Sequence, residues 1–137
     1  MKLNEIANSY IKDQDYQKAM EFYLKALEAN PADTIIQKNA AIAFYHLKDY
    51  TNALTYLNQV VEVNPGDHDS QNMMGLCFFQ LHEYSKAMMH YEKAIAIDPG
   101  NSIYKKNLEI AQSDRLLHMN RGGHAIQEVN ELNLRGN

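Results

Sequence analysis

The sequence has no tryptophan, a single cysteine and no long hydrophobic run, and each shortage excludes something. Cys77 has no second cysteine with which to form an intramolecular disulfide, which favours a reducing, cytoplasmic compartment. The longest strictly apolar run has 6 residues, far below the roughly 20 that a membrane-spanning helix needs, so we expect no membrane insertion. The 13 basic residues do not exceed the 17 acidic ones, and this balance argues against a nucleic acid partner.

Patterns that carry chemistry are also lacking. The glycines form no phosphate-binding loop, and no two histidines stand four residues apart on a helix, so we expect exposed structural histidines and no metal site. His68-Asp69-Ser70 has the residue types of a hydrolase triad, but neighbours in a turn cannot converge on one point, and helix capping is their expected role. Cys77 is expected to be a buried, inert thiol. We therefore predict no enzymatic activity, no catalytic residue and no cofactor.

Proline is scarce too, but its positions are informative. Pro31, Pro65 and Pro99 are separated by 34 residues each. The same period recurs in further columns: Tyr16, Tyr50 and Tyr84; Ala19, Ala53 and Ala87; Tyr23, Leu57 and Tyr91; Ala26, Val60 and Ala94. Self-similarity at a fixed period of this length is the signature of a tandem structural repeat.

Each repeat is expected to contain two helices. In the second half of a repeat, apolar residues fall at i, i+3, i+7, i+10 and i+11, which is one stripe of an amphipathic helix. In the first half, a tiny residue stands one turn before an aromatic one, which permits a second helix to approach closely. These pairs are Ala7 and Tyr10, Ala41 and Phe44, and Gly75 and Phe78. Acidic or amide residues before the helices are expected to cap them.

These columns resemble the tetratricopeptide repeat, a helical hairpin of 34 residues. The resemblance covers residues 1–99 and implies an all-α fold, an α-solenoid of three helix-turn-helix units at about 1–33, 34–67 and 68–101. By the same resemblance, a helix over 101–120 closes the array as a capping helix. Residues 121–137 then form a separate tail, in which Gly122-Gly123 acts as a hinge before an amphipathic segment. The frequent tryptophan of the family is replaced by Leu3, Gln37 and Gln71.

The resemblance also implies that the first helices line a concave groove, in which a peptide or helix of another protein binds. On this basis we predict a non-enzymatic scaffold or adaptor. Ile42, Leu76 and Ile110, here called the apolar rail, recur at 34-residue spacing on one helix face. The alternative is that superhelical curvature buries the rail, which then binds nothing. The predicted groove residues are Asn8, Lys38, Asn39, Ile42, Tyr45, Asn72, Met73, Leu76, Phe79, Lys106, Asn107 and Ile110.

Two other functions remain open. Ile126, Val129 and Leu132 give the tail an apolar face, so it is a candidate ligand for its own groove or for a neighbour's, the latter producing a homodimer. An unstructured tail and a truncated further repeat are the alternatives. A co-chaperone that grips acidic C-terminal tails is less favoured. Asn8 and Asn39 match residues with which such co-chaperones bind the acidic tail. At the positions where those co-chaperones carry cationic side chains, this sequence has Asn4, Asp69 and Met73.

Overall fold

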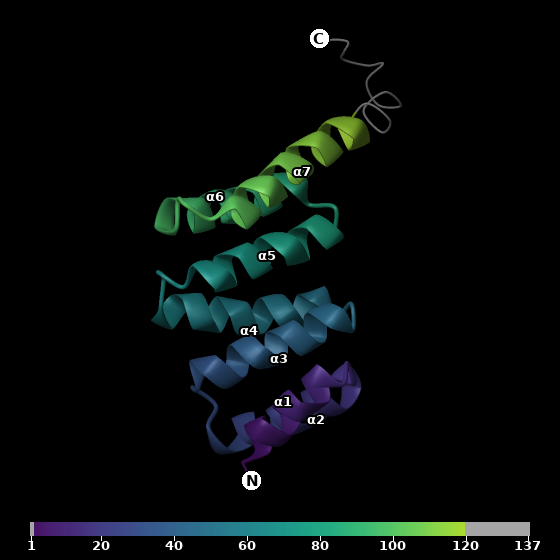
Figure 1. Ribbon diagram of the computed structural model, residues 1–137, viewed down its shortest axis with the longest axis vertical. Helices are drawn as coiled ribbons and strands as arrows, with labels where there is room; N and C mark the ends of the chain where they lie inside the picture. Colours follow the sequence, from purple (N-terminus) through teal and green to yellow (C-terminus); the bar gives the residue numbers. More distant parts are fainter. Residues whose placement is uncertain (1, 120–137) are drawn as a thin grey trace.

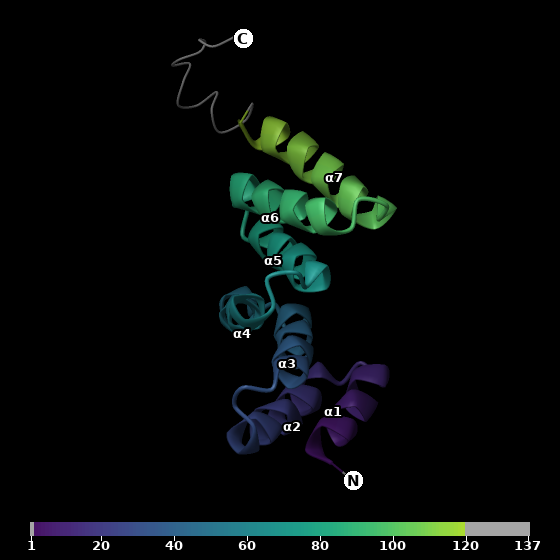
Figure 2. The same ribbon diagram turned by 90° about the vertical axis from the view of Figure 1, so that its left-hand side faces the viewer.

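Residues 2–119 of the computed structural model form seven helices, and this described part contains no strand (Figure 1). Consecutive helices pack against each other in alternating directions and stack from the N-terminal to the C-terminal end (Figures 1 and 2). The predicted all-α solenoid with a capping helix is confirmed, whereas the tail lies outside the described residues. The helices are α1 (Leu3–Lys12), α2 (Tyr16–Ala29), α3 (Thr34–His46), α4 (Tyr50–Val63), α5 (His68–Gln80), α6 (Tyr84–Ile97) and α7 (Ser102–His118).

The helix starts are set by short side chains that accept backbone hydrogen bonds. Asp33, Asp67 and Asn101 cap α3, α5 and α7 in this way. A side-chain oxygen at this position satisfies an N–H group that has no partner inside the helix. The capping role predicted for His68-Asp69-Ser70 is therefore wrong, because Asp67 holds it and Ser70 contributes only its backbone N–H to the bond.

Each hairpin turns through a residue in the left-handed region. Gln14, Lys48 and His82 have φ values of 60°, 65° and 62°. Such a residue ends the preceding helix, and the following N–H reaches back to a carbonyl of that helix, as from Glu83 to Phe78. The same turn geometry therefore recurs in all three hairpins, before α2, α4 and α6.

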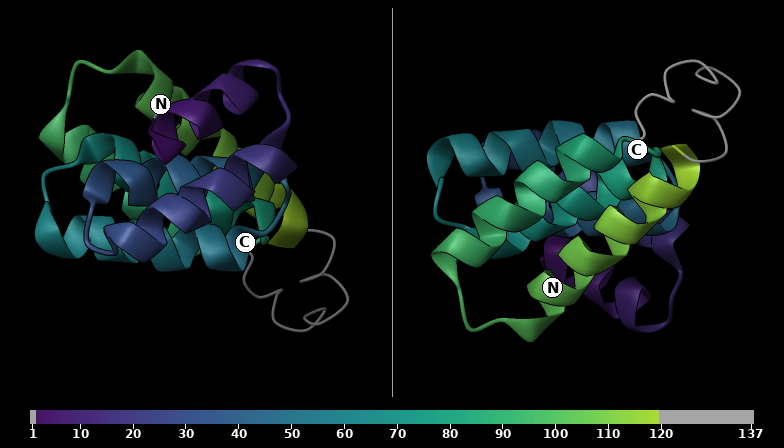
Figure 3. Two further views of the ribbon diagram at one scale, coloured as in Figure 1. Left: turned by 90° about the horizontal axis from the view of Figure 1, so that it is seen from below. Right: turned by 90° about the horizontal axis from the view of Figure 1, so that it is seen from above.

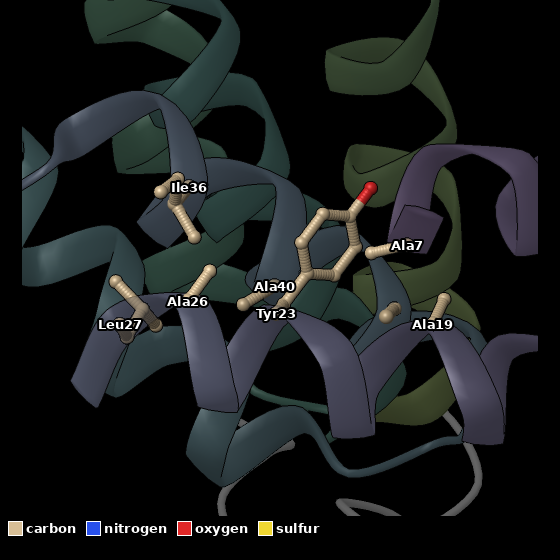
Figure 4. Packing of buried hydrophobic residues seen from close by; sticks show 8 residues of the cluster. Ala7, Ala19, Tyr23, Ala26, Leu27, Ile36 and Ala40 are labelled. Atoms are coloured by element: carbon tan, nitrogen blue, oxygen red, sulfur yellow. The ribbon is translucent and has the colours of Figure 1, made fainter. Parts of the chain in front are cut away.

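The two helices of a hairpin meet where a tiny residue faces a large one. The Tyr23 ring lies against Ala7, and their side chains are 1% and 0% exposed (Figure 4). In the third hairpin the approach is closer still. A Cβ added to Gly75 would stand 2.5 Å from Cδ1 and Cε1 of Tyr91, so only hydrogen fits there.

A second column of contacts stacks an aromatic ring of the first helix on a ring of the second. Tyr10 stacks on Phe22, and Phe44 on Tyr56, with ring centroids 5.6 and 5.8 Å apart. In the third hairpin the partner is a histidine, and Phe78 stacks on His90 with ring centroids 5.4 Å apart. The stack therefore accepts an imidazole in place of a benzene ring.

His90 corrects the expectation that the histidines are exposed. Its side chain is buried, and its Nδ1 lies 2.9 Å from Oε1 of Gln71. Since the amide oxygen can only accept a hydrogen bond, Nδ1 of His90 carries the proton and Nε2 is unprotonated. Burial, with a smaller contribution from the positive charge of Lys93, lowers the pKa of His90 to about 4. The folded protein thus holds this imidazole in its neutral form.

We expect Gly75→Ala to destabilise the protein. The new methyl group must displace the Tyr91 ring, and overpacking of this kind costs about 1–3 kcal/mol. Gly100→Ala is the matched control, because nothing lies within 4 Å of its added Cβ. Chemical denaturation followed by circular dichroism measures both. Equal unfolding free energies for the two variants would contradict the close approach at Gly75.

The stability of the protein should also fall in mild acid because of His90. Its folded pKa of about 4 lies below the ordinary value of 6.5, so the unfolded chain binds the proton more readily. The His90 contribution is complete above about pH 6.5 and is lost progressively as the pH falls toward 4. His90→Phe, which installs the residue found at Phe22, should weaken this decline. Urea denaturation across that pH range tests it, and parallel curves for the two proteins would count against it.

Candidate functional site

The first helices α3, α5 and α7 contact one another directly along one face of the stack. Lys38 of α3 forms ion pairs with two carboxylates of the next unit, at 3.0 Å to Asp67 and 3.8 Å to Asp69. Tyr104 of α7 donates its hydroxyl to Asp69 at 2.8 Å. Because these contacts join corresponding helices of successive units, they mark one continuous surface, here called the candidate groove.

One end of the candidate groove is charged, and its cation is already neutralised. Burial disfavours the ionised form of Asp67, but hydrogen bonds from Lys38 and from the backbone of Ser70 outweigh it and hold the Asp67 pKa below its usual value. Burial and the bond to Asp69 raise the pKa of Tyr104, so this phenol stays protonated. The end is therefore polar, with more carboxylates than free cations.

The middle of the candidate groove carries the predicted amides, and some of them already form hydrogen bonds with other side chains of the protein. Asn107 of α7 donates to the side-chain oxygen of Asn72 of α5 at 2.9 Å. Asn8 accepts a hydrogen bond from the hydroxyl of Tyr23, whose pKa burial raises to about 12. Asn39, half-buried, has no side-chain hydrogen bond within the described residues.

The apolar rail is present but uneven. Ile42 is half-buried, and Ile110 is 44% exposed. Leu76 and Phe79 instead pack against the core between α5, α6 and α7, and Met73 packs against the core of the second unit. Of the rail residues, Ile110 is thus exposed and Ile42 half-buried, while Leu76 packs against the core.

The opposite end of the candidate groove is aromatic. The hydroxyl of Tyr45 on α3 accepts a hydrogen bond of 3.5 Å from Gln80 of α5. The Tyr45 ring also meets the rings of His46 and Tyr50 edge-on, with centroids 5.5 Å apart in both pairs. Lys106, which is exposed on α7, stands two periods after Lys38 and so belongs to the other end. The aromatic end thus combines a ring surface with a hydrogen-bonding rim.

Sequence reasoning missed the polar network around Tyr104. Tyr104 is buried, with 3% of its surface exposed. The hydroxyl nevertheless reaches Asp69 and lies 2.7 Å from Nδ1 of His68. The available signal was spacing: Asp69 of α5 lies one 34-residue period before Ile103, the chain neighbour of Tyr104, so the two occupy equivalent positions of successive first helices.

The reactive side chains give no sign of catalysis. Cys77 is fully buried, as predicted, and burial raises the pKa of its thiol to about 12, so it is not a thiolate at neutral pH. Among residues 2–119, no three histidine, cysteine or acidic side chains stand together as a metal site. No helix in that range is long and apolar enough to cross a membrane.

The repeat family is visible in the sequence as well as in the fold. Residues 2–33 and 32–99 match family profiles described as tetratricopeptide repeat. The chain belongs to the tetratricopeptide repeat family, whose members are protein-interaction modules. The predicted unit limits of 1–33, 34–67 and 68–101 remain predictions.

Several solved structures share this architecture. The chain resembles the first tetratricopeptide domain of Spaghetti (RPAP3) bound to the HSP90 peptide SRMEEVD, with 26% identity and a TM-score of 0.78 over 82% of this chain and 89% of that one. It is also similar to the Sgt2 domain from Aspergillus fumigatus, with 27% identity and a TM-score of 0.79 over 89% and 82% of the two chains.

A curated relative matches over a shorter stretch. Human serine/threonine-protein phosphatase 5 is 40% identical over 43 residues, which are 31% of this chain and 9% of the phosphatase. This chain therefore corresponds to a small part of that protein.

Proposed function

We propose that this protein is a non-enzymatic scaffold or adaptor that binds a segment of another protein in the candidate groove. The observation that carries the proposal is the surface between Ile42 and Ile110, where apolar side chains stay accessible beside the amide of Asn39. Apolar groups supply affinity, and an amide can both donate to and accept from a peptide backbone. Spaghetti (RPAP3), a similar domain, has been solved with a peptide bound, which supports the class of ligand.

The charged end of the groove limits which peptide binds. Lys38 is held by the carboxylates of Asp67 and Asp69, so it is not free to receive a carboxylate from a ligand. Asp69 is 66% exposed and would repel an acidic peptide brought next to it. The proposed ligand is therefore an apolar segment without an acidic terminus, which argues against the co-chaperone alternative.

Ile42→Glu should weaken binding of peptides selected from a random library on the wild-type protein. A charge at an apolar contact should lower affinity by about tenfold or more, the loss expected at a buried interface position. The matched control is Met89→Glu on α6, which alters an apolar side chain that is 45% exposed away from the rail. Fluorescence anisotropy with labelled peptides gives both affinities. If Met89→Glu impairs binding and Ile42→Glu does not, the groove is not the site.

Peptides with an acidic C-terminus should bind no tighter than scrambled versions. The HSP90 peptide SRMEEVD is a suitable probe, and the Spaghetti (RPAP3) domain is the positive control. Isothermal titration calorimetry compares the free-acid and amidated forms on each protein. Micromolar binding to this chain that disappears on amidation would refute the proposed ligand class and restore the co-chaperone interpretation.

A further inference from the structure

Helix α7 carries an apolar stripe with nothing packed over it in residues 2–119. Ile103, Ile110 and Leu117 stand seven residues apart, which places them on one side of the helix. Their side chains are 65%, 44% and 51% exposed. We call these three residues the α7 stripe. Large aliphatic side chains aligned along a helix in this way are typical of a helix that has a partner.

The end of α7 adds to this surface. Helix α7 has 17 residues, whereas the first helices α3 and α5 have 13. Its last turn therefore extends beyond the length of the other first helices, and α7 lies at the outer end of the stack (Figure 1 and the right view of Figure 3). Leu116 in this extension and Met119, the C-cap residue that follows α7, are 55% and 54% exposed. The surface thus continues to the point where the tail segment begins.

The links between units elsewhere in the molecule show how few residues the chain needs to turn back on itself. Successive units are joined by the four-residue links 30–33, 64–67 and 98–101, and each link is followed by a helix that packs back on its predecessor. Between the end of α7 at His118 and the amphipathic segment that begins at 124 lie the five residues 119–123, which include Gly122-Gly123. A link of this length permits the segment to run back along α7.

We propose that residues 124–134 dock as an antiparallel helix on the α7 stripe of the same molecule. In such a hairpin Ile126 lies opposite Leu117, and Leu132 lies near Ile110. Ala125 and Leu132 are seven residues apart, as are Ile110 and Leu117. Because the spacing is equal, the apolar side chains of the two helices can contact each other at both levels. A segment this short is not stable alone in water, and α7 supplies the apolar surface that it lacks.

The occupant is the chain's own tail rather than a second copy. A short tether presents its segment at about millimolar effective concentration, above the protein concentration at which two separate chains would compete. One consequence rests on the proposed function: the docked tail covers Ile110 and so shortens the groove available to a partner. The docking itself does not depend on any partner.

A disulfide trap tests this docking in the full chain. Ile110→Cys combined with Leu132→Cys should close an intramolecular disulfide, because cysteines bridge readily when their Cα atoms come within about 7 Å. The control pair combines Leu132→Cys with Gln112→Cys, which is exposed on the other side of α7 at nearly the same chain separation. Cys77 is buried and does not compete. Non-reducing electrophoresis and mass spectrometry measure the products.

We expect the first pair to react at least about tenfold faster than the control, at a rate independent of protein concentration. Val129→Glu added to the first pair should reduce its rate to that of the control, since a charge cannot be buried against the stripe. Equal rates for the two pairs would overturn the proposal. A disulfide that links two chains, with a rate that rises with concentration, would overturn it in favour of a dimer. Because no peptide is present, neither result bears on the groove's ligand.

Discussion

The structure depends on the contact between a tiny residue of each first helix and a large side chain of the second. Ala7 against Tyr23, and Gly75 against Tyr91, fix how closely the two helices of a hairpin approach. This contact also fixes the rotation of the first helix about its axis. Once the tiny residue faces inward, the side chains on the opposite side must face the groove. The candidate site is thus a consequence of core packing.

Polar contacts along the candidate groove join successive units. Lys38, Asp69 and Tyr104 connect three successive first helices, so they support the packing of each unit on the next. In a repeat protein each unit is stabilised mainly by its neighbours. Polar contacts between units therefore add to the stability of the array, but a cation used in this way is no longer free for a ligand.

Much of the fold follows from local rules that the sequence obeys in every unit. The proline spacing, the capping residues Asp33 and Asp67, and the pairing of a tiny residue with an aromatic one predict helices, turns and their order. The candidate site was less predictable. The rail positions were found from their spacing, but spacing did not reveal that Leu76 is half-buried against the core of α6 and α7.

The sequence by itself determined which residues share a helix face, because the helical period of 3.6 residues acts within one element. Only the tertiary structure decided which faces meet. The pairing of Lys38 with Asp67 spans 29 residues and depends on the rotation from one unit to the next. The burial of His90 depends on Phe78 and Gln71 from the other helix of its hairpin. Such contacts arise from packing between elements, which no local pattern encodes.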